Sequence, residues 1–256
     1  ASADYLFYGT SHSENLGDSL GNASDVDGDG VDDIAIGSRG NTQGSVRIFL
    51  ASSTSTPGSY YQSDADHCIY TDHTGSRLIP SSGLGDIDDD GYGDVLLTDY
   101  GFANASLTLY KGMVFVVSGA DLTSSSCSYS TDMAYLQMEG EGHFDYPGYT
   151  PLGRPADMDG DGRNDILVTS YGNDDGGTDA GKGYLLLARN LPSGGTFSLS
   201  NADYVFVGEA GGDLFGLGYA FPGDVDGDGL EDLLFGAYAD DAWLVEAGRA
   251  YLFYGQ

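Results

Sequence analysis

The segment Asp25-Val-Asp-Gly-Asp-Gly-Val-Asp-Asp33 places carboxylates at loop positions 1, 3, 5 and 9, with a glycine, Gly30, at position 6. Ca²⁺ is a hard cation that takes about six to eight oxygen ligands. Carboxylates packed closely together repel one another unless a cation lies among them. Glycine at position 6 permits the positive φ of a sharp turn at little steric cost. The segment therefore predicts a calcium-binding loop, to which the backbone carbonyl of Val31 adds a ligand from position 7.

The same loop occurs four times at similar intervals along the chain, over 25–33, 86–94, 157–165 and 224–232. We therefore expect four Ca²⁺ sites, one in each of four tandem repeats. The predicted ligands are the carboxylates of positions 1, 3, 5 and 9 and the carbonyl of position 7: Asp25, Asp27, Asp29, Asp33 and Val31; Asp86, Asp88, Asp90, Asp94 and Tyr92; Asp157, Asp159, Asp161, Asp165 and Arg163; Asp224, Asp226, Asp228, Asp232 and Leu230.

An EF-hand is the main competing interpretation of these loops. An EF-hand needs a bidentate glutamate at position 12. Position 12 is apolar in all four loops, where the residues are Ile36, Leu97, Val168 and Phe235. These side chains suit a strand, which excludes the EF-hand. The other alternative is a set of ordinary Asp-Gly turns, which does not account for the repetition of the whole pattern.

Short apolar runs flank each loop, and Gly, Ser and Asp clusters separate them, which is typical of an all-β protein. Four strands are expected in each of the first three repeats and three in the last. The predicted strands include a Gly-rich one before each loop, such as 217–223; one after each loop, 34–37, 95–98, 166–170 and 233–237; a third, 45–50, 113–118, 183–188 and 249–254; and a fourth, 67–71, 134–138 and 204–207.

The strand missing from the last repeat has a counterpart at the N-terminus. Asp4-Tyr-Leu-Phe-Tyr-Gly9 matches Asp203-Tyr-Val-Phe-Val-Gly208, which is a fourth strand. We expect 5–8 to pair with 251–254 and to close a ring of four four-stranded blades. This arrangement favours a monomer; a head-to-tail dimer that exchanges the strand, or a fragment of a longer ring, are the alternatives.

The repeats resemble the FG-GAP repeats of integrin α-subunit β-propellers and related bacterial surface proteins. Leu214-Phe-Gly216 matches the FG element, Phe235-Gly-Ala-Tyr238 stands where the GAP element is expected, and Leu16-Gly17 is a looser copy. The resemblance covers nearly the whole chain. It implies a single β-propeller domain over residues 1–256 and an extracellular or cell-surface module.

Composition restricts the partners. The chain has 40 acidic and 9 basic residues and a formal net charge of −31, which disfavours nucleic acid and anionic membranes. No apolar run approaches the roughly 20 residues of a membrane span, so no membrane insertion is expected. Two cysteines, Cys68 and Cys127, are expected on the calcium-loop side of adjacent blades and are predicted to form a disulfide, with two separate thiols as the alternative.

We expect a recognition function without catalysis. The four histidines share no metal or triad spacing, and no nucleophile elbow is present in the sequence. Aromatic residues occur in the loops between second and third strands, on the face opposite the calcium loops, and suit a protein or carbohydrate ligand; they are Tyr100, Phe102, Tyr171, Tyr238 and Trp243. The alternative is a secreted polysaccharide lyase or hydrolase, or the accessory propeller domain of one.

Overall fold

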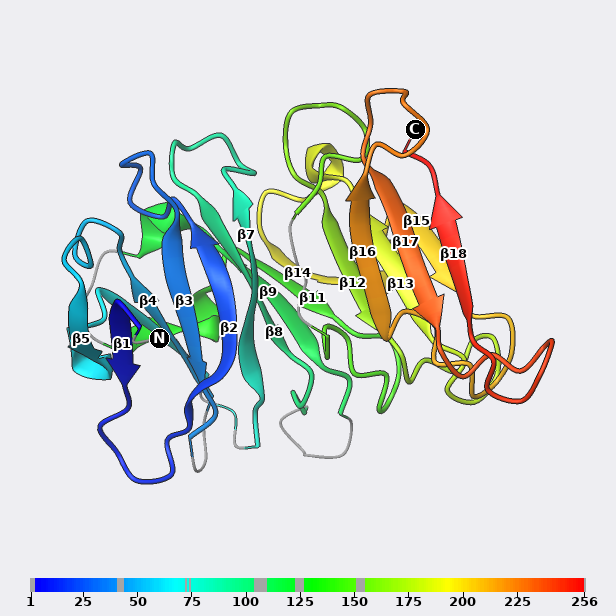
Figure 1. Cartoon of the computed structure of the whole chain (residues 1–256), viewed down its shortest axis with the longest axis horizontal. Helices are drawn as coiled ribbons and strands as arrows, with labels where there is room; N and C mark the ends of the chain where they lie inside the picture. Colours follow the sequence, from blue (N-terminus) through cyan, green and yellow to red (C-terminus); the bar gives the residue numbers. More distant parts are fainter. Residues whose placement is uncertain are drawn as a thin grey trace. The chain divides into compact units, whose positions relative to one another are not determined.

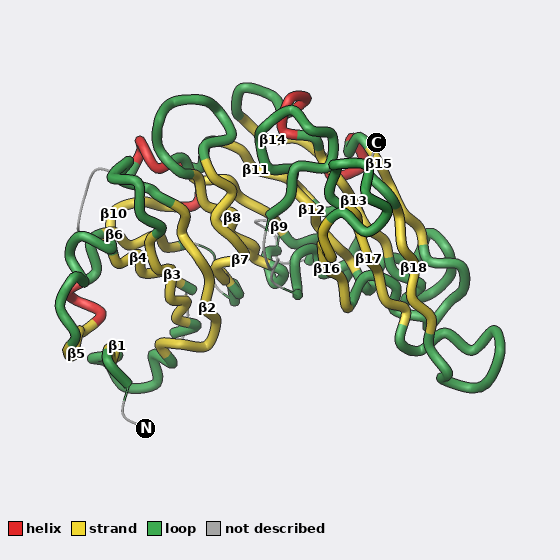
Figure 2. The backbone as a smooth tube through the Cα atoms, turned by 45° about the horizontal axis from the view of Figure 1, so that its top comes forward, coloured by secondary structure: helices red, strands yellow, loops and turns green. Residues whose placement is uncertain are grey.

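The computed structural model describes residues 3–40, 44–71, 73, 75–103, 110–122, 127–150 and 155–255, and the side chains of residues 127 and 128 lie outside the description. Its secondary structure is almost entirely β, as predicted (Figure 2). The helices in this part of the chain are single 3₁₀ turns: Gln62–Asp64, Gly119–Asp121, Thr131–Met133, Ala188–Asn190 and Leu199–Asn201.

The chain forms two compact units. Unit 1 comprises Ala1–Leu97 and Phe115–Tyr135, and unit 2 comprises Thr98–Val114 and Leu136–Gln256. The expectation of a single domain over residues 1–256 stays a prediction.

Unit 1 contains a five-stranded sheet of order β10-β6-β4-β3-β2 and the two-stranded sheet β1-β5 (Figure 1). Neighbours from β2 to β6 are antiparallel, whereas β10 runs parallel to β6 and β5 parallel to β1. The bounds are β1 Tyr5–Tyr8, β2 Leu16–Ser24, β3 Asp33–Ser38, β4 Ser45–Phe49, β5 Gly58–Tyr61, β6 His67–Tyr70 and β10 Cys127–Ser130.

A second five-stranded sheet has the order β14-β11-β9-β8-β7, and the boundary between the units falls within β8 and β9. Its strands are β7 Leu78–Gly85, β8 Asp94–Asp99, β9 Met113–Val117, β11 Leu136–Glu139 and β14 Gly195–Ser198. Unit 2 also holds two antiparallel three-stranded sheets, β12-β13-β15 and β16-β17-β18. Their strands are β12 Ile166–Ser170, β13 Lys182–Leu186, β15 Tyr204–Val207, β16 Gly218–Gly223, β17 Asp232–Ala237 and β18 Arg249–Phe253.

The repeat pattern predicted from the sequence is largely present. The first repeat gives β2, β3, β4 and β6, and the second gives β7, β8, β9 and β11. The second, third and fourth strands of these repeats lie within about two residues of the expected bounds, and β2 and β7 precede their loops as expected. In the third repeat the strand before the loop is represented by an isolated bridge between Ala156 and Asp165, because residues 151–154 lie outside the description. The fourth repeat gives β16, β17 and β18.

Three strands that the sequence analysis missed are β5, β10 and β14. Each follows the third strand of a repeat. β10 and β14 pair in parallel with β6 and β11, the fourth strands of the preceding repeats, and β5 pairs in parallel with the N-terminal β1. An aromatic residue occupies the third position of each, namely Tyr60, Tyr129 and Phe197. Consecutive repeats are therefore interlocked, because one supplies a strand to the sheet of the other.

The predicted pairing of 5–8 with 251–254 would join unit 1 to unit 2 and stays a prediction. β1 pairs with β5, with Tyr5 opposite Gly58 and Tyr8 opposite Tyr61. Its Phe7 packs on Phe49 with ring centroids 4.8 Å apart. This ring joins the apolar cluster of the first repeat, which stabilises β1 there. The described strands form five separate sheets, and the closed four-bladed ring stays a prediction.

The disulfide prediction is supported by the pairing of β6 with β10. Cys68 is buried and disulfide-bonded. Cys127, the other cysteine of the chain, is its Cα partner in the register of these strands. The bond therefore fastens the strand supplied by the second repeat to the sheet of the first.

Candidate metal centres

Each acidic loop connects the first strand of its repeat to the second. Residues 25–33 join β2 to β3, 86–94 join β7 to β8, and 224–232 join β16 to β17. The loop at 157–165 runs from the bridged Ala156 to β12. All four loops therefore lie before the second strand of a sheet, as the sequence predicts.

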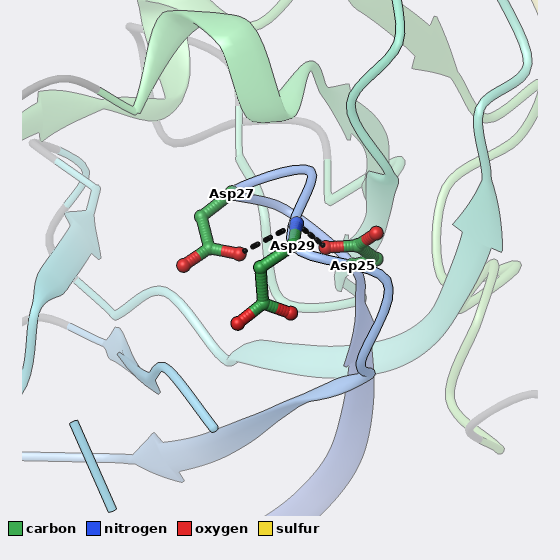
Figure 3. A group of neighbouring side chains, drawn as sticks. All are labelled: Asp25, Asp27 and Asp29. Carbon is green, nitrogen blue, oxygen red and sulfur yellow. Dashed lines mark hydrogen bonds between the residues drawn. The ribbon is translucent and has the colours of Figure 1, made fainter. Parts of the chain in front are cut away.

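The position 1 carboxylate organises the turn in each loop. In the first loop Asp25 Oδ1 accepts a hydrogen bond from Asp29 N at 2.9 Å (Figure 3). Asp25 Oδ2 accepts a second one from Gly30 N at 2.8 Å. The same two acceptor roles are filled by Asp86, Asp157 and Asp224. Four sequence copies thus produce four copies of one hydrogen-bonded loop.

The glycine at position 6 has the predicted backbone conformation. Its φ is +88° at Gly30, +94° at Gly91, +94° at Gly162 and +97° at Gly229. These values lie in the region that residues with a Cβ rarely adopt, so another residue would strain the turn. The preference for glycine at this position is therefore a backbone requirement.

The structure brings the predicted carboxylates together in every loop. In each group one oxygen from each of three residues lies within 4.8 Å of the others. The groups are Asp25, Asp27 and Asp29; Asp86, Asp88 and Asp90; Asp157, Asp159 and Asp165; and Asp224, Asp226 and Asp232. The first two groups use positions 1, 3 and 5, and the last two use positions 1, 3 and 9. In Figure 3 the carboxylates of Asp25 and Asp27 lie on either side of the Asp29 amide, which donates to both.

Position 9 has a structural role that the sequence analysis did not foresee. Asp232 is fully buried, and its two oxygens accept from Val225 N at 2.7 Å and Gly255 N at 3.0 Å. Asp33 and Asp165 make the equivalent pair of bonds to backbone groups at loop position 2 and after the third strand. The position 9 carboxylate therefore ties its loop to the third strand of the sheet.

Burial raises the pKa of the position 9 carboxyl groups of the first three loops. Desolvation raises the pKa of Asp33 and of Asp165 to about 6, and that of Asp94 to about 7, despite backbone hydrogen bonds that oppose the shift. The neighbouring loop carboxylates raise each pKa further. A cation placed among these groups would lower the cost of keeping them ionised.

The donor set fits a hard divalent cation. The gathered atoms are carboxylate oxygens, which Ca²⁺ prefers and which soft metals do not. Asp88 Oδ1 is buried and accepts no hydrogen bond, and burial together with Asp90 raises the pKa of this carboxyl group. An unpaired buried carboxylate oxygen inside the cluster is an available ligand. The position 7 carbonyls stay predicted ligands.

The third loop differs from the others in its counter-charge. Arg189 Nη1 lies 2.7 Å from Asp159 Oδ2, whose side chain is 2 % exposed. In the first loop the residue at the equivalent place is Ser52, whose Oγ donates weakly to Asp27 Oδ2 over 3.4 Å. Arg163 adds a second guanidinium 3.4 Å from Asp161 Oδ2. The sequence analysis missed Arg189, because it follows β13 and lies far outside the loop motif in the sequence.

This difference predicts that the third loop binds Ca²⁺ most weakly. Arg189→Ser, which copies the first loop, is expected to tighten the weakest site about fivefold, equivalent to about 1 kcal/mol for a half-exposed ion pair. Calorimetric calcium titration measures the change. Arg39→Ser removes the same charge from an exposed pair with Asp18 and serves as the control. The prediction is contradicted if the weakest site binds Ca²⁺ with the same affinity in the parent and in Arg189→Ser.

Residues 154–186 match the sequence model of the FG-GAP repeat. The chain contains an FG-GAP repeat. The matched FG-GAP segment includes the third acidic loop and continues through β12 to the end of β13. A search of curated proteins gives no match to the chain. Within the described residues, no helix is long and apolar enough to cross a membrane.

Two of the aromatic residues proposed to contact a ligand, Tyr100 and Tyr171, belong to a larger group of contacting rings in unit 2. Tyr171 stacks on Tyr146 with centroids 5.5 Å apart, and Tyr100 packs edge-on against Tyr149 at 4.9 Å. Successive ring contacts connect seven rings, which we call the aromatic row: Tyr100, Tyr149, Tyr171, Tyr146, Phe144, His143 and Tyr110. Of the remaining candidates, Tyr238 and Trp243 are exposed and Phe102 is half-buried.

Proposed function

We propose that the chain is a calcium-stabilised, extracellular or cell-surface β-propeller module that binds a protein or glycan ligand without catalysing a reaction. The observation that carries the proposal is the fourfold recurrence of one acidic, hydrogen-bonded loop before the second strand of each sheet. The FG-GAP repeat at residues 154–186 contains one of these loops, which supports extending the same interpretation to the other three.

The succession of sheets supports the propeller part of the proposal. Antiparallel strands follow one another in sequence order within each repeat, the parallel strands β10 and β14 join the second and third repeats to the preceding ones, and β5 joins the first repeat to β1. Radial repetition of small antiparallel sheets is the architecture of propellers. Calcium at the loops would hold the entry to each second strand in place.

The aromatic row is the ligand surface that we propose. β8 and β12 begin at acidic loops, and Tyr100 and Tyr171 follow the opposite ends of these strands. Tyr110, Phe144 and Tyr149 are exposed. Exposed aromatic faces with nearby polar groups suit the stacking of sugar rings or the side chains of a protein partner. The net charge of −31 disfavours an anionic ligand.

Backbone strain supports a specific role for this row. Phe144 and Tyr146 have φ values of 69° and 54°. The equivalent turn of the first repeat adopts the same conformation with Ser13 and Asn15, and that of the fourth with Gly212 and Leu214. The conformation therefore belongs to the fold, but two aromatics at these positions are special to this turn. A large side chain at positive φ is unfavourable, and a binding role would compensate for it.

A glycan array and a panel of candidate protein ligands test the proposal, with calcium present throughout. Binding is expected to fall at least about tenfold in Phe144→Ser, since interface aromatics commonly contribute more than about 1.4 kcal/mol. This variant copies Ser13 of the first repeat, so the turn conformation is retained. Trp243→Ser, an exposed aromatic outside the row, is the control. Equal loss in both variants, or binding that Phe144→Ser leaves unchanged, rejects the aromatic row as the ligand surface.

A further inference from the structure

The outer edge of β15 is open where the equivalent edge of the preceding repeat is covered. β11, the fourth strand of the second repeat, lies between β9 and β14. β15, the fourth strand of the third repeat, pairs with β13 alone among the described strands. Tyr204, the first residue of β15, is 46 % exposed, whereas Leu136, the first residue of β11, is fully buried. β15 therefore lacks the parallel neighbour that β11 has.

The three strands that cover such edges share a sequence pattern. Each has a small residue first, a hydroxyl residue second and an aromatic residue third, and each runs parallel to the strand that it covers. They are Gly58-Ser-Tyr-Tyr61 on β1, Cys127-Ser-Tyr-Ser130 on β6 and Gly195-Thr-Phe-Ser198 on β11. The aromatic residue lies opposite the third residue of the covered strand in every pair: Tyr60 opposite Phe7, Tyr129 opposite Ile69 and Phe197 opposite Met138. One type of strand thus fits all three edges.

An apolar pocket of about 200 Å³ lies beside β15, and Phe206 of β15 and Phe253 of β18 both line it. These two rings pack together with centroids 4.6 Å apart. The equivalent rings of the first repeat, Phe7 and Phe49, pack together at 4.8 Å, and Tyr60 of the covering strand β5 stacks on Phe7 at 5.6 Å. The pocket therefore corresponds to the place that Tyr60 fills in the first repeat.

The size and lining of the pocket suit an aromatic ring. An apolar cavity of about 150 Å³ is large enough to hold benzene. Besides the two phenylalanines, the lining includes Leu185, Tyr204 and Leu233. All the residues that line the pocket belong to unit 2, so the whole site lies within one unit.

We propose that the edge of β15 and this pocket form a docking site for an extended segment of a partner protein. The segment runs parallel to β15 and places an aromatic side chain from its third position in the pocket. Addition of a strand to a sheet edge gives affinity through backbone hydrogen bonds, and pockets for alternate side chains give specificity. The segment comes from a partner because the strands of this pattern in the described chain, β5, β10 and β14, already cover β1, β6 and β11.

The pairs in the structure also predict the register of the docked segment. β5 on β1 and β14 on β11 pair first residue with first residue and fourth with fourth. Transfer of this register places the second and fourth residues of the segment opposite Val205 and Val207, which are both exposed. Its aromatic third residue then lies opposite Phe206. No residue of the aromatic row takes part, so the inference does not rest on the proposed function.

A peptide that copies residues 194–202 with blocked ends is the probe for this site. It contains the sequence of β14 and the 3₁₀ turn that follows, and it has no charged side chain, so the acidic chain does not repel it. Fluorescence anisotropy of the labelled peptide, titrated with the whole chain in calcium, is expected to show saturable binding. Phe197→Ser in the peptide is expected to weaken binding at least about tenfold, because the ring that fills the pocket is lost.

Disulfide crosslinking tests the place and the direction of docking. The native disulfide of Cys68 already joins the parallel strands β6 and β10. Val205→Cys in the chain is expected to crosslink to a Thr196→Cys peptide, and Val207→Cys to a Ser198→Cys peptide. The two crossed combinations are the controls, since an offset of two residues displaces the thiols by about 7 Å along the strand.

Saturable binding that depends on Phe197, together with crosslinks in the matched combinations, supports the proposal. Crosslinks in the crossed combinations alone indicate an antiparallel strand and overturn it. So does equal binding of the Phe197→Ser peptide, or absence of binding with the chain at about 1 mM, which is the result if the chain itself covers the groove. Phe144→Ser in the chain is expected to bind the peptide as the parent does, so failure here leaves the proposed recognition function standing.

Discussion

Removal of calcium is expected to lower the melting temperature by about 12–24 °C. At free calcium about ten times the dissociation constant, each site that exists only in the folded state contributes about 1.4 kcal/mol, and four sites contribute about 6 kcal/mol. For a domain of this size, 1 kcal/mol corresponds to about 2–4 °C. The calcium-free protein must also keep three or more carboxylates together in each loop without a cation.

Thermal unfolding in excess chelator and after addition of calcium measures this shift. Magnesium at the same concentration is the control, since its smaller size and octahedral preference suit these loops less well. Asp226→Ala removes a predicted ligand from one loop and is expected to remove one calcium ion per chain. A melting curve that does not change on complete metal removal would falsify the calcium prediction.

Asp232→Ala is expected to destabilise the protein by about 2–6 kcal/mol even without calcium. Asp232 is fully buried and accepts from both Val225 N and Gly255 N. Alanine leaves the buried Gly255 N–H and the partly buried Val225 N–H unpaired, and each unsatisfied donor costs about 1–3 kcal/mol. Denaturant unfolding of metal-free protein isolates this cost from any loss of calcium binding.

Two comparisons identify the source of that loss. Asp232→Asn keeps one carbonyl oxygen as an acceptor and is expected to cost about half as much. Asp226→Ala, in the same loop but on exposed backbone, is expected to change metal-free stability by less than about 0.5 kcal/mol. If Asp226→Ala and Asp232→Ala are equally destabilised without metal, position 9 is a ligand position without the structural role that its hydrogen bonds indicate.

The loops and most strands were predictable because their constraints are local. The turn at Gly30 follows from the backbone, and the bonds that Asp25 accepts come from residues four and five positions later. The second strand, such as Ile166–Ser170, is a short apolar run bounded by polar turns. Local hydrogen bonding and hydrophobic pattern thus determined the type and place of these elements.

The elements that were missed depend on distant partners. β5, Gly58-Ser-Tyr-Tyr61, has no apolar alternation, and it forms a strand because β1, from the first residues of the described chain, lies beside it. Position 9 looked like a fourth ligand, and its bond to the segment after the third strand appears only in the folded sheet. The sequence of β1 showed its type but did not show its parallel partner β5.

The parallel strands also determine how long some strand edges stay unpaired while the chain is being translated. Synthesis of β6 is complete at Tyr70, but its outer edge is covered only after β10 has been synthesised up to Ser130. In the same way, the edge of β11 ends at Glu139 and waits for β14, which is complete at Ser198. At translation rates of about 5–20 residues per second, an interval of this length leaves each edge uncovered for roughly 3–12 s. Ribosomes that follow one another closely on the message would bring such edges together, so widely spaced ribosomes should give the highest yield of folded chain.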